Sequence, residues 1–390
     1  MKDSLLPPAS PPERSRGGQS KNVAAKAGVK ADPATVAARV KSVVRPKIRA
    51  MHAYPVAKAA GLIKLDAMEN PYGLSGEARA EIAAAVANAR INRYPDGSGD
   101  EVKAALRESL GLADDVGIVL GNGSDELLQL LTMLVAKPGA TVLAPDPSFV
   151  LYRMQAEVYN LRFVGVPLRA DLTLDIDAML AAIAREQPAL VWLAVPNNPT
   201  GTLFPVGDVE RIIAAAPGLV AVDEAYYAFA DATFLPRVLE FPNLLVVRTV
   251  SKIGMAGVRL GYAAGHPDWI AQIDKIRPPY NINVLTQAVV PVLLRHEALL
   301  TEQAAAIRRE RTRMARELAK LRRVTVFPSD ANFLLMRVPD APQWFGTLRD
   351  AGILVKNVHG WHPLLDNCLR ITIGTPAENN AVLEALSRYA

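Results

Sequence analysis

The feature that most constrains the fold is a regular alternation between about residues 118 and 264. Short runs rich in aliphatic and β-branched residues alternate there with longer amphipathic runs. The short runs read GIVLG, TVLAP, RFVGVPL, LVWLAV, LVAVDE, LLVVRTV and RLGYAA, and helices are expected between them. Nearly continuous apolar strands separated by helices are typical of a parallel sheet that is covered on both faces. The sequence therefore predicts an α/β fold with a mostly parallel sheet between helices.

The flanking segments predict the rest of the domain organisation. Residues 1–32 are expected to form a disordered basic leader, because four prolines fall within residues 7–12 and Ser, Arg, Gly and Lys follow. Valines at helical spacing predict a helix from about Pro33. We expect residues 33–75 to contribute to a small domain, residues 76–283 to form the large domain, and residues 284–390 to form a small C-terminal α+β domain.

The positive charge of the chain is concentrated at its start. The net charge is +5, but the first 50 residues hold 11 Lys and Arg against 3 Asp and Glu, which leaves 33 against 36 for the remainder. A basic tail can bind RNA or membrane headgroups. Because no aromatic residues are interleaved with these charges, a solvated leader is the favoured interpretation, and we expect neither a nucleic-acid nor a membrane partner.

Apolar stretches and cysteine content indicate a cytoplasmic protein. The longest apolar runs, such as 127–136, fall well short of the roughly 20 residues of a membrane-spanning helix. The first 18 residues lack the apolar core and cleavage site of a secretory signal. The single cysteine, Cys368, excludes an intrachain disulfide and agrees with a reducing compartment.

Four short segments carry residues suited to chemistry at the ends of expected strands. They are GNGSDE (121–126), PNNPTG (196–201), DEAYY (223–227) and TVSKIGMAGVRLGY (249–262). Ligands of parallel sheets bind at the carboxyl ends of the strands. The glycines of GNGSDE and the helix that begins there can bind an anion through backbone N–H groups. Helix capping by Ser124 is an alternative, and one segment can do both.

A lysine and an aspartate each close an apolar strand. Lys252 lies where burial lowers the pKa of an amine and makes its neutral form a usable nucleophile, whereas a lone lysine there is more often a surface residue. Asp223 closes LVAVDE, where a carboxylate needs a cationic partner or serves as a helix cap.

Taken together, the order and spacing of the four segments resemble the active site of fold type I pyridoxal-phosphate enzymes, the aspartate aminotransferase superfamily. Within it, the chain is most similar to histidinol-phosphate aminotransferases, and this resemblance runs from about residue 45 to the end. It is carried by IKLDAMENPYG (63–73), NRYPDGSG (92–99), GNGSDELLQLL, PDPSFVLYR (145–153) and CLRITIGT (368–375). The resemblance implies a homodimer, with residues 33–75 also making dimer contacts.

The resemblance also implies a role for each matching position. The catalytic residues are Lys252, which forms a Schiff base with pyridoxal 5'-phosphate, Asp223, which pairs with its ring nitrogen, and Tyr226. The cofactor-binding set is Gly123, Ser124, Asp125, Phe149, Asn198, Asp223, Tyr226, Thr249, Ser251, Lys252 and Arg259, with Tyr94 reaching the neighbouring subunit's cofactor. The substrate-side set is Tyr54, Asn70, Asn332 and Arg370. The histidines lack metal-ligand spacing, so we expect no metal.

The expected function is transfer of an amino group from histidinol phosphate to 2-oxoglutarate, a step of histidine biosynthesis. Two alternatives use the same scaffold, namely an aromatic-amino-acid aminotransferase and a threonine-phosphate decarboxylase. A third alternative is a transcription regulator in which a DNA-binding extension is fused to an aminotransferase-like domain. The leader is short and Pro-rich and lacks a convincing helix-turn-helix, which disfavours the regulator.

Overall fold

The computed structural model describes residues 30–53 and 56–387 of the 390-residue chain, which divides into two compact units, residues 1–53 and 54–390. In the first unit the described residues form helices α1 (Pro33–Val43) and α2 (Pro46–Ala50). Helix α1 begins at Pro33 as predicted, because Asp32 accepts hydrogen bonds from the backbone N–H groups of Ala34 and Thr35. Residues 1–29 of the expected leader lie outside the described residues.

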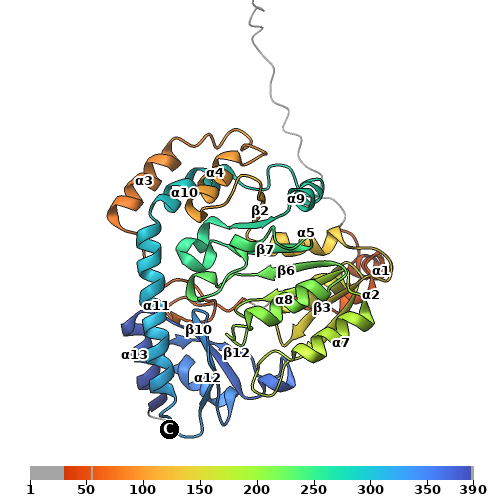
Figure 1. The fold of residues 1–390 in the computed structure, drawn as a ribbon. Helices are drawn as coiled ribbons and strands as arrows, with labels where there is room; N and C mark the ends of the chain where they lie inside the picture. The colour runs from red at the N-terminus through yellow and green to blue at the C-terminus, as the bar shows by residue number, and fades with distance from the viewer. Residues whose placement is uncertain (1–29, 54–55, 388–390) are drawn as a thin grey trace, which may run out of the picture. The chain divides into compact units, whose positions relative to one another are not determined.

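The second unit is built on a seven-stranded sheet in the order β2-β8-β7-β6-β5-β3-β4 (Figure 1). Its strands are β2 (Gly117–Asn122), β3 (Thr141–Asp146), β4 (Arg162–Pro167), β5 (Leu190–Ala194), β6 (Leu219–Asp223), β7 (Leu244–Thr249) and β8 (Leu260–Gly265). Strand β8 runs antiparallel to β2 and β7, and the other neighbouring pairs are parallel. The prediction of a mostly parallel sheet is confirmed.

Helices cover both faces of this sheet. They are α3 (Gly76–Ala87), α4 (Asp100–Leu110), α5 (Ser124–Leu134), α6 (Val150–Val158), α7 (Ile176–Glu186), α8 (Val206–Ala215) and α9 (Pro267–Asp274). Successive strand residues point to opposite faces, so Val222 packs in one core with α4, α7 and α8, whereas Ala221 packs in another with α5, α6 and α9. Strands β5, β6 and β7 are buried along their whole length, which explains their continuous apolar sequences.

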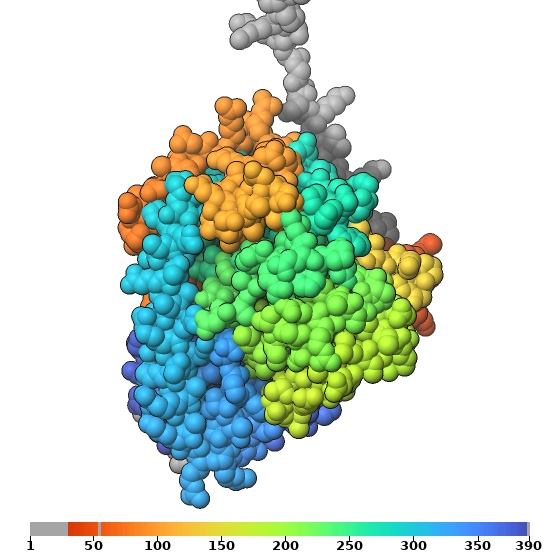
Figure 2. All heavy atoms as spheres, viewed as in Figure 1, coloured from red at the N-terminus to blue at the C-terminus, as the bar shows by residue number. Residues whose placement is uncertain are grey.

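Helix α10 (Val284–Arg295), which the sequence assigns to the small domain, packs in the core of the large sheet. The residues that follow form a smaller α+β region with helices α11 (Glu297–Leu318), α12 (Ala341–Asp350) and α13 (Pro376–Ser387). Its antiparallel sheet has the order β12-β13-β10-β9, formed by Lys356–Asn357, Cys368–Thr372, Phe333–Arg337 and Thr325–Val326. Figure 2 shows the blue C-terminal residues at one end of the unit, opposite the orange residues that include α3 and α4.

Two contacts show how the segments before and after the large sheet are connected to the rest. Strand β1 (Ile63–Lys64) pairs in parallel with β11 (Ile353–Leu354), so part of the expected 33–75 segment joins the C-terminal region. Helix α10 packs on α3 and α4, whereas the long α11 packs on α13 and β10 and runs between the two ends of the unit (Figure 1). Helix α11 therefore links the large sheet to the smaller one.

Among the helices that the structure describes, no single one is long and apolar enough to cross a membrane. Helices α10 and α11 pass that test of length and composition only as a pair, which is bent by 76°.

Candidate active site

A cavity of about 610 Å³ lies at the carboxyl ends of the strands of the large sheet. Its walls come from the ends of β5, β6 and β7, the starts of α5 and α6, the segment 64–69, and the strands β12 and β13 of the smaller sheet. The predicted site residues that line it are Ser124, Asp125, Phe149, Asn198, Asp223, Tyr226, Thr249, Ser251, Lys252, Arg259 and Arg370. The structure thus brings most of the predicted site together where ligands of parallel sheets bind.

Lys252 lies in the short helical turn Ser251–Met255 that follows β7. Its Nζ donates a hydrogen bond to the carbonyl oxygen of Ala67 at 3.1 Å. Burial, aided by the positive charge of Arg370, lowers the pKa of Lys252 to about 8. A large fraction of this amine is therefore neutral at mildly alkaline pH and available as a nucleophile or a base.

Asp223 is the last residue of β6 and is buried. One carboxylate oxygen accepts a hydrogen bond from the hydroxyl of Tyr152 at 2.7 Å, and the other accepts from the backbone N–H of Ala225 at 3.1 Å. Burial raises the pKa of Asp223 to about 6, although both hydrogen bonds act in the opposite direction. Both donors are neutral, so a cation in the cavity would stabilise the charged carboxylate.

The turn between β2 and α5 forms one end of the cavity together with Arg259. Gly123 precedes α5 with φ of +78°, and a Cβ at this position would lie 2.5 Å from the Arg259 guanidinium. Arg259 Nη1 donates to the Ser251 hydroxyl at 3.4 Å, and Nη2 lies 3.7 Å from an Asp125 carboxylate oxygen. We call Gly123, Ser124, Asp125, Ser251 and Arg259 the anion cup, because a helix N-terminus, hydroxyls and a guanidinium converge there.

The smaller sheet contributes two cationic side chains to the wall of the cavity. Arg370 on β13 is buried and donates to the side-chain oxygen of Asn198 at 2.6 Å and to the carbonyl oxygen of Asp66 at 3.0 Å. Lys356 is paired with Arg370 across β12 and β13, and both residues line the cavity. Burial, and then the charge of Arg370, lower the pKa of Lys356. The cavity therefore has cationic groups from both sheets, Arg259 in the anion cup and Arg370 and Lys356 on the smaller sheet.

Sequence reasoning missed Tyr152 and Lys356. Tyr152 is stacked on Trp192 with ring centroids 4.9 Å apart and touches Phe149 edge-on at 5.7 Å. It stands three residues after Phe149 in PDPSFVLYR, a spacing that places both on one helix face and could have identified it. Lys356 depends on the register of β12 against β13, which no pattern in the sequence indicates.

Four predicted residues do not line the cavity. The side-chain amide of Asn70 donates to the carbonyl oxygen of Ile253 at 3.2 Å and to Gln303 at 2.9 Å, and that of Asn332 donates to the carbonyl oxygen of Met68 at 2.9 Å. Both asparagines thus brace backbone beside the cavity. Tyr94 is 82% exposed and stacks on Tyr280, and Gly123 lies behind the Arg259 guanidinium. Tyr54 lies outside the described residues.

Known proteins resemble the chain over nearly its whole length. The family of aminotransferase class I and II matches residues 60–386. A histidinol-phosphate aminotransferase of Chromobacterium violaceum is 54% identical over 350 residues, which are 90% of this chain and 98% of that protein. The crystal structure of histidinol-phosphate aminotransferase from Sinorhizobium meliloti in complex with pyridoxal-5'-phosphate matches with a TM-score of 0.78 and 27% identity, covering 90% of this chain and 99% of that one.

A third protein shares the fold at lower identity. It is the L-threonine-O-3-phosphate decarboxylase of Porphyromonas gingivalis, which matches with a TM-score of 0.73 and 20% identity over 84% of this chain and 99% of that one. The fold alone therefore does not separate transfer of an amino group from decarboxylation. By its family match and its 54% identity to a full-length relative, the chain belongs to the aminotransferase class I and II family and, within it, to the histidinol-phosphate aminotransferases.

Proposed function

We propose that the chain uses pyridoxal 5'-phosphate to transfer the amino group of histidinol phosphate to 2-oxoglutarate, a step of histidine biosynthesis. The observation that carries this proposal is the arrangement of one cavity. A half-buried amine with lowered pKa, Lys252, and a buried carboxylate with raised pKa, Asp223, share a cavity with the anion cup. Paired groups with opposite pKa shifts are frequent at catalytic sites.

The residues present fit pyridoxal 5'-phosphate at three points. The cup offers Arg259, hydroxyls and the start of α5 to the phosphate, and Gly123 leaves room for the guanidinium. Asp223, whose hydrogen-bond donors are neutral, suits a protonated ring nitrogen. Phe149 lines the cavity and suits contact with a flat ring. Tyr226 and Asn198 also line the cavity, and we propose that they contact the phenolic oxygen.

When bound, pyridoxal 5'-phosphate supplies an aldehyde that links covalently to amines and a protonated ring that withdraws electrons from the substrate carbon. Lys252 would hold the cofactor through its Nζ. Once released, the same Nζ would accept the proton from the substrate carbon and return it, and a pKa of about 8 suits an amine that both accepts and donates a proton near neutral pH.

Asp223 would keep the ring nitrogen protonated, and Tyr152 orients the Asp223 carboxylate through the 2.7 Å hydrogen bond. Burial alone would favour the protonated acid, since it raises the pKa of Asp223 to about 6. A positive ring nitrogen beside the carboxylate reverses this effect and lowers the pKa again. Because Asp223 is buried, its carboxylate would pair more strongly with a cation than an exposed carboxylate would.

The cationic side chains Arg370 and Lys356 support two substrates that each carry an anionic group. Histidinol phosphate carries a phosphate, and 2-oxoglutarate carries a distal carboxylate that must use the same pocket in the second half of the reaction. Arg370 offers a planar fork, and Lys356 adds a point charge beside it. These two side chains are our candidates for the clamp that binds both anions in turn.

We further propose a cytoplasmic homodimer. The exposed stacked pair Tyr94 and Tyr280, which are 82% and 46% exposed, gives each chain an aromatic surface that a second copy can cover. Tyr94 would then reach the phosphate of the cofactor held by the partner subunit. The single buried cysteine, Cys368, agrees with a reducing compartment.

One activity panel tests the proposed reaction and its rivals. Purified full-length protein loaded with pyridoxal 5'-phosphate is assayed with histidinol phosphate, phenylalanine, tyrosine and threonine phosphate, each with 2-oxoglutarate. We expect glutamate formation with histidinol phosphate at the highest kcat/KM. A wide preference for phenylalanine or tyrosine would reject the substrate assignment, and release of CO2 from threonine phosphate without glutamate would identify a decarboxylase.

A further inference from the structure

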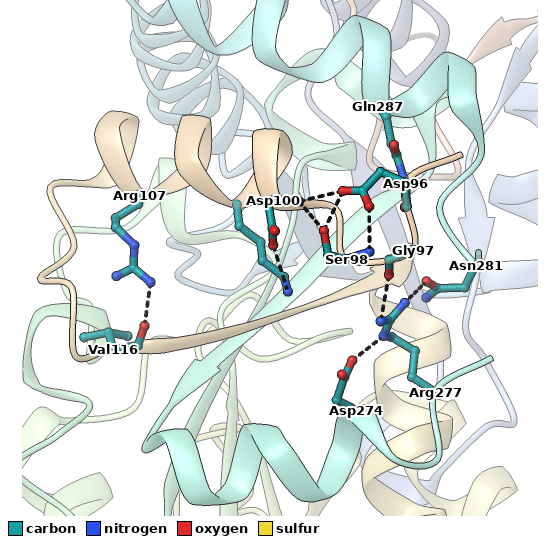
Figure 3. A network of polar contacts seen from close by, with 11 residues as sticks. Asp96, Gly97, Ser98, Asp100, Arg107, Val116, Asp274, Arg277, Asn281 and Gln287 are labelled. Carbon is teal, nitrogen blue, oxygen red and sulfur yellow. Dashed lines mark hydrogen bonds and ion pairs between the residues drawn. The ribbon is translucent and has the colours of Figure 1, made fainter. Parts of the chain in front are cut away.

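Three segments that are distant in the sequence meet beside the anion cup. They are the loop 93–100, the segment 274–287, which runs from the end of α9 into the first turn of α10, and the turn from β2 into α5. Figure 3 shows Arg277, Asn281 and Gln287 directed toward the loop that carries Asp96 and Gly97. Arg277 donates to the carbonyl oxygen of Gly97 at 3.0 Å, and Gln287 donates to that of Asp96 at 2.7 Å. The loop is thus held by side chains of the second segment.

Asn281 connects this arrangement to the cup. Its side-chain nitrogen donates to the Glu126 carboxylate at 2.6 Å and to the carbonyl oxygen of Leu120 on β2 at 3.1 Å. Its side-chain oxygen accepts from Arg277 at 2.7 Å. One amide side chain therefore joins the end of a strand, the first turn of α5 and the arginine that holds the loop.

Glu126 makes this link relevant to anion binding. It lies in the first turn of α5, directly after Ser124 and Asp125 of the cup. Its carboxylate also accepts from the backbone N–H of Asn122 at 2.7 Å, so it folds back over the turn that precedes the helix. A carboxylate so near an anion site would repel a phosphate if it were free to turn toward it. Asn281 supplies the second donor that fixes it in place.

We propose that Asn281 is a positioning residue for the phosphate of the cofactor. It holds the Glu126 carboxylate against Asn122, keeps the turn 122–125 in the shape that forms the cup, and joins that turn to the loop of Tyr94. This inference rests on the proposed function, since it takes the cup to hold the phosphate of pyridoxal 5'-phosphate.

If the inference is right, replacing Asn281 weakens the binding of ligands that carry the phosphate and leaves the binding of those that lack it nearly unchanged. Asn281→Ala removes both donors and the acceptor, and we expect it to weaken binding of pyridoxal 5'-phosphate to the full chain about tenfold, the effect of one lost hydrogen bond to a charged group. Binding of pyridoxal, which has no phosphate, should change less than about twofold. A general loosening of the fold would weaken both ligands together. Equilibrium titration of the stripped protein with each ligand separates these outcomes.

A matched control lies two residues away. Asn283 caps α10 by accepting hydrogen bonds from the backbone N–H groups of Leu285 and Thr286, both at 3.0 Å. Asn283→Ala therefore removes a helix cap from the same segment, and we expect it to leave the ratio of the two affinities unchanged. Asn281→Asp is the second variant, to be used if Asn281→Ala does not fold. It keeps the shape of the side chain but faces Glu126 with a second carboxylate, so it should also weaken binding of pyridoxal 5'-phosphate more than binding of pyridoxal.

A double variant tests the role of the Glu126 charge. Glu126→Gln keeps an oxygen acceptor and removes the charge, so Glu126→Gln combined with Asn281→Ala should recover most of the lost affinity for pyridoxal 5'-phosphate. The inference is wrong if Asn281→Ala behaves like Asn283→Ala, weakens pyridoxal equally, or gains nothing from Glu126→Gln. Wild-type protein that binds no pyridoxal 5'-phosphate would instead reject the proposed function, and this inference with it.

Discussion

At the scale of single residues, one physical cause shifts two pKa values in opposite directions. Burial disfavours the charged form of any group. It therefore lowers the pKa of the Lys252 amine to about 8 and raises that of the Asp223 carboxyl to about 6. The shift of Lys252 favours the neutral amine, which is the nucleophilic form. The shift of Asp223 favours the neutral acid, and a cation beside it would restore the carboxylate.

The pKa of Lys252 predicts the pH dependence of cofactor attachment. The neutral amine is the reactive form, so the rate of covalent attachment to stripped protein should rise with pH and level off above about 8. An ordinary lysine would continue to gain reactivity up to about pH 10.4. Stopped-flow absorbance at a series of pH values measures this profile. A rate that still rises steeply above pH 9 would contradict the lowered pKa.

Arg370 is predicted to act through the geometry of its guanidinium as well as its charge. Arg370→Lys keeps the charge but loses the two-pronged contact with Asn198 and Asp66. We expect single-turnover rates of both half-reactions at low substrate to fall at least about tenfold, corresponding to about 1.4 kcal/mol. The visible spectrum of the lysine-bound cofactor should persist. Arg211→Lys, at an exposed ion pair with Asp208, is the control and should change neither half-reaction.

If Arg370→Lys spares both half-reactions, the anion clamp lies elsewhere in the cavity. If it impairs the amino donor alone, the two substrates do not share a clamp.

At the scale of elements, the turn between β2 and α5 is predicted to require glycine for a steric reason. Gly123 and Gly139 both have positive φ, +78° and +79°, so alanine should cost stability at either position, and more at Gly123, whose ψ of 168° lies in a region that only glycine readily adopts. A Cβ at Gly123 meets the Arg259 guanidinium at 2.5 Å, whereas a Cβ at Gly139 meets nothing within 4 Å. We expect only Gly123→Ala to weaken binding of pyridoxal 5'-phosphate, as measured by titration beside thermal unfolding. If Gly123→Ala and Gly139→Ala bind pyridoxal 5'-phosphate with equal affinity, Arg259 does not contribute to phosphate binding.

The elements also show what the sequence could and could not predict. The continuous apolar runs of β5, β6 and β7 predict buried parallel strands. Asp223 and Lys252 could be predicted as site residues because Asp223 ends β6 and Lys252 comes shortly after the end of β7. Lys356 could not be predicted, since it joins the cavity through the pairing of a two-residue strand. Short strands are specified by tertiary packing, which a local pattern does not contain.

Asn70 and Asn332 show a second limit of the same kind. Both were placed on the substrate side by resemblance, and the structure has their amides on the backbone carbonyls of Ile253 and Met68. A sequence identifies an amide side chain but does not tell whether a ligand or a neighbouring peptide satisfies it.

At the scale of the whole molecule, Tyr94 is predicted to complete the site of a second subunit. Tyr94→Phe should weaken retention of pyridoxal 5'-phosphate by about 1–3 kcal/mol if the hydroxyl contacts the charged phosphate. Mixed dimers of Tyr94→Phe and Lys252→Ala subunits test the crossing. The subunit that keeps Lys252 then receives an intact Tyr94 from its partner, so its cofactor affinity should return to that of wild type. An active site that stays as weak as in Tyr94→Phe alone would place Tyr94 within its own subunit.

The most direct measurement for the whole mechanism is the location of the covalent bond to the cofactor. Borohydride reduction of the full-length protein loaded with pyridoxal 5'-phosphate, followed by peptide mapping, should place the label on Lys252 alone. Lys252→Ala should carry no label and show no turnover, because it lacks the amine of lowered pKa that lies in the same cavity as Asp223 and the anion cup. A label on another lysine, or turnover by Lys252→Ala close to that of wild type, would contradict the assignment of this cavity as the active site.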